Sequence, residues 1–246
     1  MITHSTNYNM DYKVLRNLER YTYERFSRSY VHQRFMLKVA VWCISMKVRR
    51  SLKRMLDLTI ALMAMPILLP FMLLTALAIK LDSPGPAIFR QTRVGKWGQP
   101  FTCYKFRSMH IDAEQRKAEL LQQNEADGPV FKMQNDPRVT RVGRIIRKLS
   151  IDELPQFFNV LKGDMSLVGP RPSLPTEVSE YEFEFVRRFE AVPGITGLQQ
   201  VSGRSDLDFQ RWMELDLEYV ARRGIRQDIE IIWKTIPAVL LGRGAY

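Results

Sequence analysis

The sequence predicts a predominantly helical α+β protein held at a membrane by one kinked helix that enters and leaves on the same side, a monotopic arrangement. Three observations carry this prediction: an uncharged apolar run at Leu58–Ile79, two prolines inside that run, and more helical than strand patterns in the remainder. We expect a basic, amphipathic N-terminal arm over residues 1–50, a re-entrant membrane helix over 51–80 and a third domain over 81–246, with interfacial helices and a small β-hairpin.

Composition and length exclude several classes of protein. The chain has 246 residues, of which 46% are hydrophobic and 26% charged, values that exclude a disordered, collagenous or disulfide-scaffold protein. The two cysteines, Cys43 and Cys103, form no CxxC pair, and the three histidines, His4, His32 and His110, complete no zinc-binding spacing. A reducing compartment is therefore expected.

The net charge of +11 is concentrated in the arm. Residues 1–55 hold twelve Lys and Arg against three acidic residues, a balance of +9, whereas the other 191 residues hold 25 basic and 23 acidic side chains. Aromatic and aliphatic residues alternate with the basic ones over Tyr12–Lys53, which is typical of a helix on anionic headgroups. A solvated basic helix or a disordered tail is the alternative.

The run Leu58–Ile79 is long enough for a membrane. It contains 22 residues without a charge, and a straight helix of that length spans about 33 Å against a hydrocarbon core of about 30 Å. Because the run begins far into the chain, a cleavable signal peptide is not expected.

Two features of the run favour re-entry over a straight span. Pro66 and Pro70 each remove a backbone hydrogen bond near mid-depth. Both flanks are basic, with six Lys or Arg over residues 38–57 and four over 80–99, and positive flanks favour the cytoplasmic side. A bent helix that returns to the side from which it entered satisfies both features. A straight span and a buried helix of a soluble core are the alternatives.

The remainder begins with a turn at Leu81–Pro86 and a hairpin of two strands, Ala87–Arg90 and Phe101–Phe106. A loop is expected over Asp127–Thr140. The spacing Phe183, Val186, Phe189 predicts an apolar stripe that packs in the core. The predicted helices are Asp112–Glu125, Arg141–Lys148, Leu154–Leu161, Leu174–Phe189, Asp208–Arg222 and Asp228–Leu241.

The residues best suited to chemistry lie between 143 and 172. Ser150–Glu153 has the pattern of a helix-start capping box, and Asp152 lies at the spacing of an N-cap before Pro155, so spacing alone favours a structural role. The functional alternative is an anion-binding site. Arg144 and Arg147 would bind phosphate oxygens, while Asp152 serves as nucleophile or as a ligand of Mg²⁺.

Five ordered blocks resemble the bacterial sugar transferases, the monotopic phosphoglycosyl transferases, over roughly residues 50–246. The blocks are KRMLD at Lys53–Asp57, LDSPGPAIFRQTRVG at Leu81–Gly95, YKFRSM at Tyr104–Met109, SIDELPQFFNVLKGDMSLVGPRP at Ser150–Pro172 and PGITGLQQVSGR at Pro193–Arg204.

The resemblance implies an enzyme whose cytoplasmic catalytic domain is residues 81–246. It would transfer a sugar 1-phosphate from a UDP-sugar to undecaprenyl phosphate with Mg²⁺, release UMP through an aspartyl phosphosugar intermediate, and act at the cytoplasmic face of the bacterial inner membrane. This is the first membrane step in making an exopolysaccharide, capsule or O-antigen repeat unit. The similarity of Gly242–Tyr246 to exopolysaccharide-type members favours glucose or galactose, with an N-acetylhexosamine as the alternative.

The resemblance also assigns roles to residues. It implies that Asp152 is the nucleophile, that Glu153 is its partner in a catalytic dyad, and that Arg147 binds phosphate. The motif Pro170–Pro172, with Arg171 at its centre, matches the motif associated with the uridine nucleotide.

The remaining candidates have structural alternatives. Lys105 and Arg107 face the phosphates or merely end a strand, and Arg204 binds the nucleotide or belongs to an ordinary glycine turn. Pro70 lies where the family breaks its re-entrant helix, but the usual preceding serine is Leu69 here. The absent hydroxyl leaves the geometry of the kink open.

The expected partners are thus a UDP-sugar, undecaprenyl phosphate and an anionic phospholipid membrane, with a homodimer left open. Nucleic acid is not expected, because the basic excess is confined to the arm and the body contains no stacking-aromatic motif. A membrane-attached nucleic-acid-binding or scaffold protein is the alternative from another class.

Overall fold

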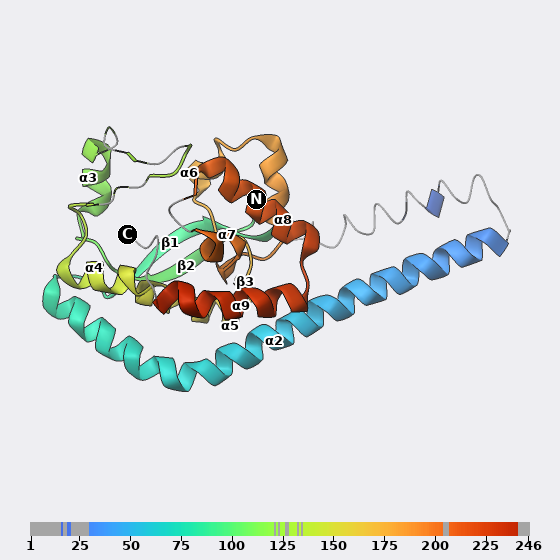
Figure 1. Ribbon diagram of the computed structural model, residues 1–246, viewed down its shortest axis with the longest axis horizontal. Coiled ribbons are helices and arrows are strands. Elements are labelled where there is room, and N and C mark those ends of the chain that lie inside the picture. The colour runs from blue at the N-terminus through green and yellow to red at the C-terminus, as the bar shows by residue number, and fades with distance from the viewer. Residues whose placement is uncertain are drawn as a thin grey trace, which may run out of the picture. The chain divides into compact units, whose positions relative to one another are not determined.

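A computed structural model describes residues 16, 19–20, 30–120, 122, 124–125, 128–131, 133, 135–203 and 207–240. The chain divides into two compact units, residues 1–52 and 53–246. Most described residues are helical, as predicted, and Figure 1 shows the helices around a small hairpin. The longer elements are α2 (Tyr30–Asp82), β1 (Ile88–Val94), β2 (Pro100–Phe106), α3 (Ala113–Leu120), α4 (Arg141–Lys148), α5 (Gln156–Lys162), α8 (Phe209–Arg222) and α9 (Ile225–Leu240). The shorter ones are η1 (Lys96–Gly98), η3 (Ile151–Glu153), β3 (Ser166–Val168), α6 (Pro175–Val178), η4 (Phe183–Glu190), β4 (Gly194–Thr196) and α7 (Leu198–Ser202).

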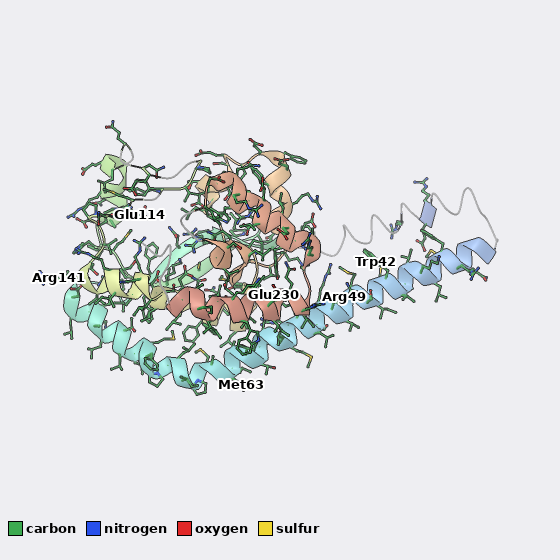
Figure 2. The ribbon with its side chains drawn as sticks, in the orientation of Figure 1. Trp42, Arg49, Met63, Glu114, Arg141 and Glu230 are labelled. Atoms are coloured by element: carbon green, nitrogen blue, oxygen red, sulfur yellow. The ribbon has the colours of Figure 1, made fainter. Side chains whose placement is uncertain are left out.

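In the first unit, the part of α2 over residues 30–52 carries basic and exposed apolar side chains together. Trp42 and Arg49 both project from it in Figure 2, and Leu37, Val41 and Ile44 are also exposed. Most of the predicted arm before residue 30 lies outside the described residues.

In the second unit, one stripe of α2 packs against the body. Its buried residues, Asp57, Ala61, Met65, Met72 and Ile79, are spaced by multiples of a helical turn. The opposite face exposes 42–80% of each of its large apolar side chains, which are Leu62, Met63, Ile67, Leu69, Phe71, Leu73, Leu74, Leu77 and Leu81. Because only 17% of the most apolar stretch is buried, the alternative of a soluble core helix does not fit. By length and composition α2 is able to cross a membrane, which agrees with membrane association.

Both prolines remain inside α2 and lie on its exposed face. Figures 1 and 2 show the helix changing direction beyond Met63, in the part that contains Pro66 and Pro70. Whether this bend returns the chain to one side of a bilayer stays a prediction.

A buried polar network joins α2 to the rest of the second unit. The Asp57 carboxylate accepts hydrogen bonds from the Ser166 hydroxyl at 2.8 Å and the Leu167 amide at 3.2 Å. The Lys53 ammonium lies 3.0 Å from both Asp57 and Asp228 on α9. The apolar helix is therefore part of the folded body and not a tether.

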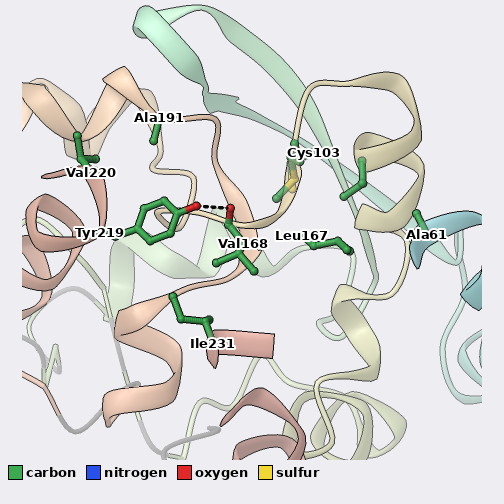
Figure 3. Close-up of a cluster of buried hydrophobic side chains, with 10 residues drawn as sticks. Ala61, Cys103, Leu167, Val168, Ala191, Tyr219, Val220 and Ile231 are labelled. Carbon is green, nitrogen blue, oxygen red and sulfur yellow. Dashed lines mark hydrogen bonds between the residues drawn. The ribbon is translucent and has the colours of Figure 1, made fainter. Parts of the chain in front are cut away.

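The hairpin follows the prediction, with longer strands. Strands β1 and β2 pair antiparallel from Ile88 opposite Phe106 to Val94 opposite Pro100. Beneath it lies a second, parallel pair, β3 with β4, that the sequence did not predict. Figure 3 shows the core around this pair, where the Tyr219 hydroxyl lies 3.0 Å from the carbonyl of Val168.

The predicted helix Leu174–Phe189 is wrong. The segment forms the short helix α6 and the 3₁₀ helix η4 instead. The predicted stripe is wrong at two of its three positions, because Phe183 is 91% and Val186 44% exposed and only Phe189 is buried. The other buried positions of the segment are Phe185 and Arg188.

Candidate active site

Asp152 and Glu153 lie in the single turn η3, directly after α4. The preceding Ser150 adopts a left-handed conformation, with φ of 57° and ψ of 19°, which is unusual for a residue with a side chain. Its hydroxyl makes no capping hydrogen bond, and α5 begins at Gln156 without a side-chain cap. The capping interpretation of this segment is therefore wrong, and both carboxylates are available for chemistry.

Glu153 is held by two cations. Its Oε1 atom lies 2.7 Å from the Lys105 ammonium and 3.2 Å from the Arg171 guanidinium. Burial by itself raises the pKa of Glu153, but the charges of Lys105 and then Arg171 outweigh it and lower the pKa to about 2. Glu153 is thus an anion at neutral pH.

Asp152 has a different environment. Among the described residues, no side chain lies within hydrogen-bond distance of its carboxylate. Burial, followed by the negative charge of Glu153, raises the pKa of Asp152 to about 6, against the opposing charges of Lys105, Arg147 and Arg171. An unpartnered carboxylate beside three cations has the properties of a nucleophile toward an anionic substrate.

Lys105 reaches Glu153 because β2 is fixed along its length. The buried amide of Asn159 on α5 donates to the carbonyl of Thr102 at 2.6 Å and accepts from the amide of Tyr104 at 3.0 Å. The Asn159 amide pairs with the backbone of β2 as a neighbouring strand would, and it fixes the position of β2 against α5, the helix that follows the dyad.

Arg147 is positioned by the start of α4. Thr140 caps this helix through its hydroxyl, and Gly143 lies so close to the carbonyl of Ser108 that a Cβ atom there would come within 1.9 Å of that oxygen. One turn later Arg147 lines the cavity beside the dyad. Arg144 is exposed on α4 and does not line the cavity, so the structure does not bring it to the dyad.

The motif Pro170–Pro172 follows β3 and brings Arg171 to Glu153. Both prolines are buried. Of this segment, Arg171 and Pro172 line the cavity, and Pro170 does not. Arg204, the other predicted nucleotide-binding residue, lies outside the described residues.

Arg107 lines the cavity of the dyad and also binds the turn after α2. Its buried guanidinium donates to the carbonyls of Ser83 at 2.7 Å and Pro84 at 2.6 Å and to the Ser83 hydroxyl at 2.9 Å. These bonds fix the turn after α2. The phosphate contact of Arg107 stays a prediction.

The dyad opens into a cavity of about 1060 Å³. At the dyad, the cavity is lined by Asp152, Glu153, Lys105, Arg147 and Arg171. Other charged residues also line it, namely Arg93, Arg107, Glu114, Lys117, Arg138 and Glu177. Its apolar lining includes residues of α2, the hairpin and α9, namely Leu68, Ile88, Phe89, Phe106, Ile232 and Ile236. A cavity that combines several cations with apolar side chains suits a substrate that is both phosphorylated and lipidic.

These features define a class of protein: a membrane-associated one with an acidic dyad among cations, suited to phosphoryl-type transfer. The comparison with known families is more specific. The profile of the bacterial sugar transferase family matches residues 48–242, and the chain belongs to that family.

Individual relatives name several sugars. The chain is 50% identical over 194 residues to the galactosyl transferase CpsE of Streptococcus agalactiae serotype III, covering 78% of this chain and 43% of that one. It is 47% identical to an Aeromonas hydrophila UDP-N-acetylgalactosamine-undecaprenyl-phosphate N-acetylgalactosaminephosphotransferase, covering 79% and 45%. It is 43% identical to the Caulobacter vibrioides UDP-glucose:undecaprenyl-phosphate glucose-1-phosphate transferase, covering 79% and 72%. The chain thus spans less than half the length of the first two.

Proposed function

We propose that this chain transfers a hexose 1-phosphate, with glucose or galactose as the sugar, from a UDP-sugar to undecaprenyl phosphate and releases UMP. The observation that carries the proposal is the Asp152 carboxylate, which no side chain of the described residues contacts, beside Glu153, Lys105, Arg147 and Arg171 in the cavity. Family membership and relatives named for undecaprenyl-phosphate sugar transfer support it.

The first half of the reaction uses Asp152 as nucleophile. A carboxylate oxygen attacks the phosphorus nearest the sugar, a new P–O bond forms to Asp152, and the bond from that phosphorus to the bridging oxygen breaks. UMP leaves with the bridging oxygen and its electron pair. In the second half, a phosphate oxygen of undecaprenyl phosphate attacks the same phosphorus and displaces the carboxylate, so one transfer becomes two.

Neither half requires a general acid. The attacking carboxylate and lipid phosphate are already anions, and UMP is a stable leaving group. Glu153 stays ionised because Lys105 and Arg171 hold it, so its role is to orient these two cations and not to donate a proton. The cations offset the charge that gathers at the reacting phosphorus, which is the main source of catalysis in such transfers.

Magnesium belongs to the proposal as well. No group of three His, Cys, Asp or Glu able to hold a metal exists among the described residues. The carboxylate pair fits the usual Mg²⁺ arrangement, in which one or two carboxylates act together with substrate phosphates. When bound, Mg²⁺ would supply charge neutralisation at the diphosphate, with Asp152 as its protein ligand.

The proposed location is the cytoplasmic face of the bacterial inner membrane, in the first membrane step of exopolysaccharide, capsule or O-antigen repeat-unit synthesis. The exposed apolar face of α2 supports contact with lipid, and the cavity includes residues of that helix. A water-soluble UDP-sugar and a lipid-bound acceptor would meet at such an interface. The homodimer stays a prediction.

The test is UMP release by the purified protein with undecaprenyl phosphate and a panel of UDP-glucose, UDP-galactose and their N-acetylated counterparts. We expect Asp152→Asn to lower kcat by about four or more orders of magnitude while the protein stays folded, the scale seen when a covalent nucleophile is removed. Without acceptor, the wild type should retain one sugar phosphate on Asp152, detectable by peptide mass. Activity within about tenfold of wild type in Asp152→Asn would exclude this mechanism.

A further inference from the structure

Each of the four backbone carbonyls of residues 170–173 accepts a hydrogen bond from another part of the chain. The carbonyl of Pro170 accepts from the Gly194 amide at 2.9 Å, and the carbonyl of Ser173 accepts from the Val94 amide at 2.9 Å. Between them, the carbonyl of Arg171 accepts from the Arg188 guanidinium at 2.8 Å and that of Pro172 from the Arg93 guanidinium at 3.0 Å. Two of the four bonds therefore come from side chains of distant elements.

Arg188 is buried to an unusual degree for a cation. Its side chain is 1% exposed, as is that of Asp216 on α8, whose carboxylate lies 2.5 Å from it. The same guanidinium also donates to the hydroxyls of Ser173 and Tyr181, and the rings of Tyr181, Phe189 and Trp212 surround it at 5.6–5.9 Å. The arginine is thus neutralised, enclosed and aimed at one backbone oxygen.

Stability does not explain this arrangement. Replacing a buried ion pair by apolar residues of similar volume is often neutral or stabilising. Geometry does explain it, because the guanidinium fork donates to several acceptors in a fixed plane, which an ammonium cannot do. Arg93 follows the same logic on β1, where Gln91 fixes its other nitrogens at 2.6 and 3.0 Å.

We propose that Arg188, with Asp216, and Arg93 are positioning residues that fix the 170–173 segment and so hold the Arg171 side chain against Glu153, ready for the diphosphate of the UDP-sugar. The inference rests on the proposed function and goes beyond it. Arg188 does not line the cavity, whereas Arg93 does; each donates to a carbonyl next to, or at, Arg171 and acts through it.

The test compares two variants that release the segment from different sides. Arg93→Met removes the bond to Pro172, and the double variant Arg188→Met with Asp216→Leu removes the bond to Arg171 without leaving a buried charge. We expect each to raise the KM for UDP-sugar and the Kd for UDP at least about tenfold, while the KM for undecaprenyl phosphate stays within about twofold. Arg188→Lys, which keeps the charge without the fork, should raise the KM for UDP-sugar as well.

Met213→Ala is the matched control, because Met213 is fully buried in the same cluster as Trp212 and makes no polar contact with residues 170–173. It should lower the melting temperature and the active fraction but leave both KM values unchanged. A folded Arg93 or Arg188 variant with a wild-type KM for UDP-sugar overturns the inference, as does an equal rise in both KM values. UDP binding separates the two claims: a wild type that binds UDP but releases no UMP refutes the proposed function alone, whereas one that binds no UDP refutes both.

Discussion

Asp152 and Glu153 are neighbours in the chain, yet the pKa values of their carboxyl groups are shifted in opposite directions. Glu153 lies in direct contact with Lys105 and Arg171, whereas Asp152 is half-buried and no cation of the described residues forms an ion pair with it. The pKa of Glu153 is therefore lowered and that of Asp152 raised. Different pKa values in an adjacent acid pair are a mark of divided roles in catalysis.

The raised pKa of Asp152 implies a cost in stability. A carboxyl group whose pKa is higher in the folded than in the unfolded protein stabilises the fold only while it is protonated, so this contribution is lost as the pH rises from about 4 to about 6. In EDTA, we expect Asp152→Asn to melt within a degree or so of wild type below this window and a few degrees higher at pH 7. That difference corresponds to about 1 kcal/mol after allowance for solvent.

Thermal melts of both proteins from about pH 3 to about pH 8 test this expectation. Lys162→Gln is the control, because Lys162 is exposed on the far end of α5, and it should show no such pH-dependent difference. An Asp152→Asn protein that is less stable than wild type at pH 7 would contradict the raised pKa.

Among single residues, the dyad could be predicted from the sequence, but the residues that position it could not. Asp152, Glu153 and Arg171 stand in long motifs with close neighbours of one chemistry. Asn159 lies in the same block as the dyad and Arg93 in the block Leu81–Gly95, but nothing local indicates which backbone groups they bind. Arg188 gave no signal, because its partner Asp216 is 28 residues away and a lone arginine in a polar stretch predicts solvent exposure.

Among the elements, α4 depends on the close approach of Gly143 to Ser108. A Cβ atom would come within 1.9 Å of the Ser108 carbonyl oxygen and within 2.9 Å of the Thr140 hydroxyl that caps the helix. We expect Gly143→Ala to cost about 1–3 kcal/mol, the usual range for overpacking, and to displace Arg147. The KM for UDP-sugar should rise in the fraction that remains folded.

Gly224→Ala is the matched control, since the nearest atom to its added Cβ is 3.8 Å away. It should cost less than about 1 kcal/mol, the scale of a helix N-cap preference. If Gly143→Ala melts and reacts like Gly224→Ala, the close approach does not position α4.

Whether an element could be predicted depends on how strong its local sequence pattern is. The hairpin, α4 and α8 were predicted because their periodicity and turn residues extend over seven residues or more. Strands β3 and β4 have three residues each and pair only through tertiary contact, where Gly169 and Gly194 let two backbones meet. Neither periodicity nor turn chemistry reveals such a pair.

The prolines of α2 lead to a prediction about topology. Because each removes a helical hydrogen bond, and both flanks are basic, residues 51 and 99 should lie on the same side of the membrane. Cysteines placed at Ser51 and at Gln99, both exposed, in a protein lacking Cys43 and Cys103, should be labelled only from the cytoplasmic side. Replacing Pro66 and Pro70 together by leucine should straighten the helix and expose one label to the periplasm. Periplasmic labelling of either site in the parent protein would establish a straight span instead.

In the whole molecule, the excess positive charge and the candidate active site lie in different parts of the chain. The basic excess of +9 lies within residues 1–55, whereas Asp152, Glu153 and their neighbouring cations belong to a body that is nearly neutral. Because nucleic-acid binding would require basic residues along a working surface, the arm alone does not favour it. An anionic lipid surface suits the combination of Arg49 and neighbouring cations with exposed Trp42, Val41 and Ile44.

The last prediction weighs the arm against α2 as membrane anchors. A polybasic segment gains about 1 kcal/mol per Lys or Arg near an anionic surface, and salt screens this gain. Burial of the exposed apolar face of α2, which includes Phe71, Leu73 and Leu77, in lipid contributes about 25 cal/mol per Å². This free energy is far larger than that of the arm, and salt does not weaken it. Deleting residues 1–45 should therefore leave the protein in the membrane after a high-salt wash, with UMP release retained. A matched variant that keeps the arm but carries Phe71→Asp, Leu74→Asp and Leu77→Asp on the exposed face should instead leave the membrane in high salt. If the arm-deleted protein becomes soluble, the apolar face of α2 is covered by protein and not by lipid, and the re-entrant topology fails with it.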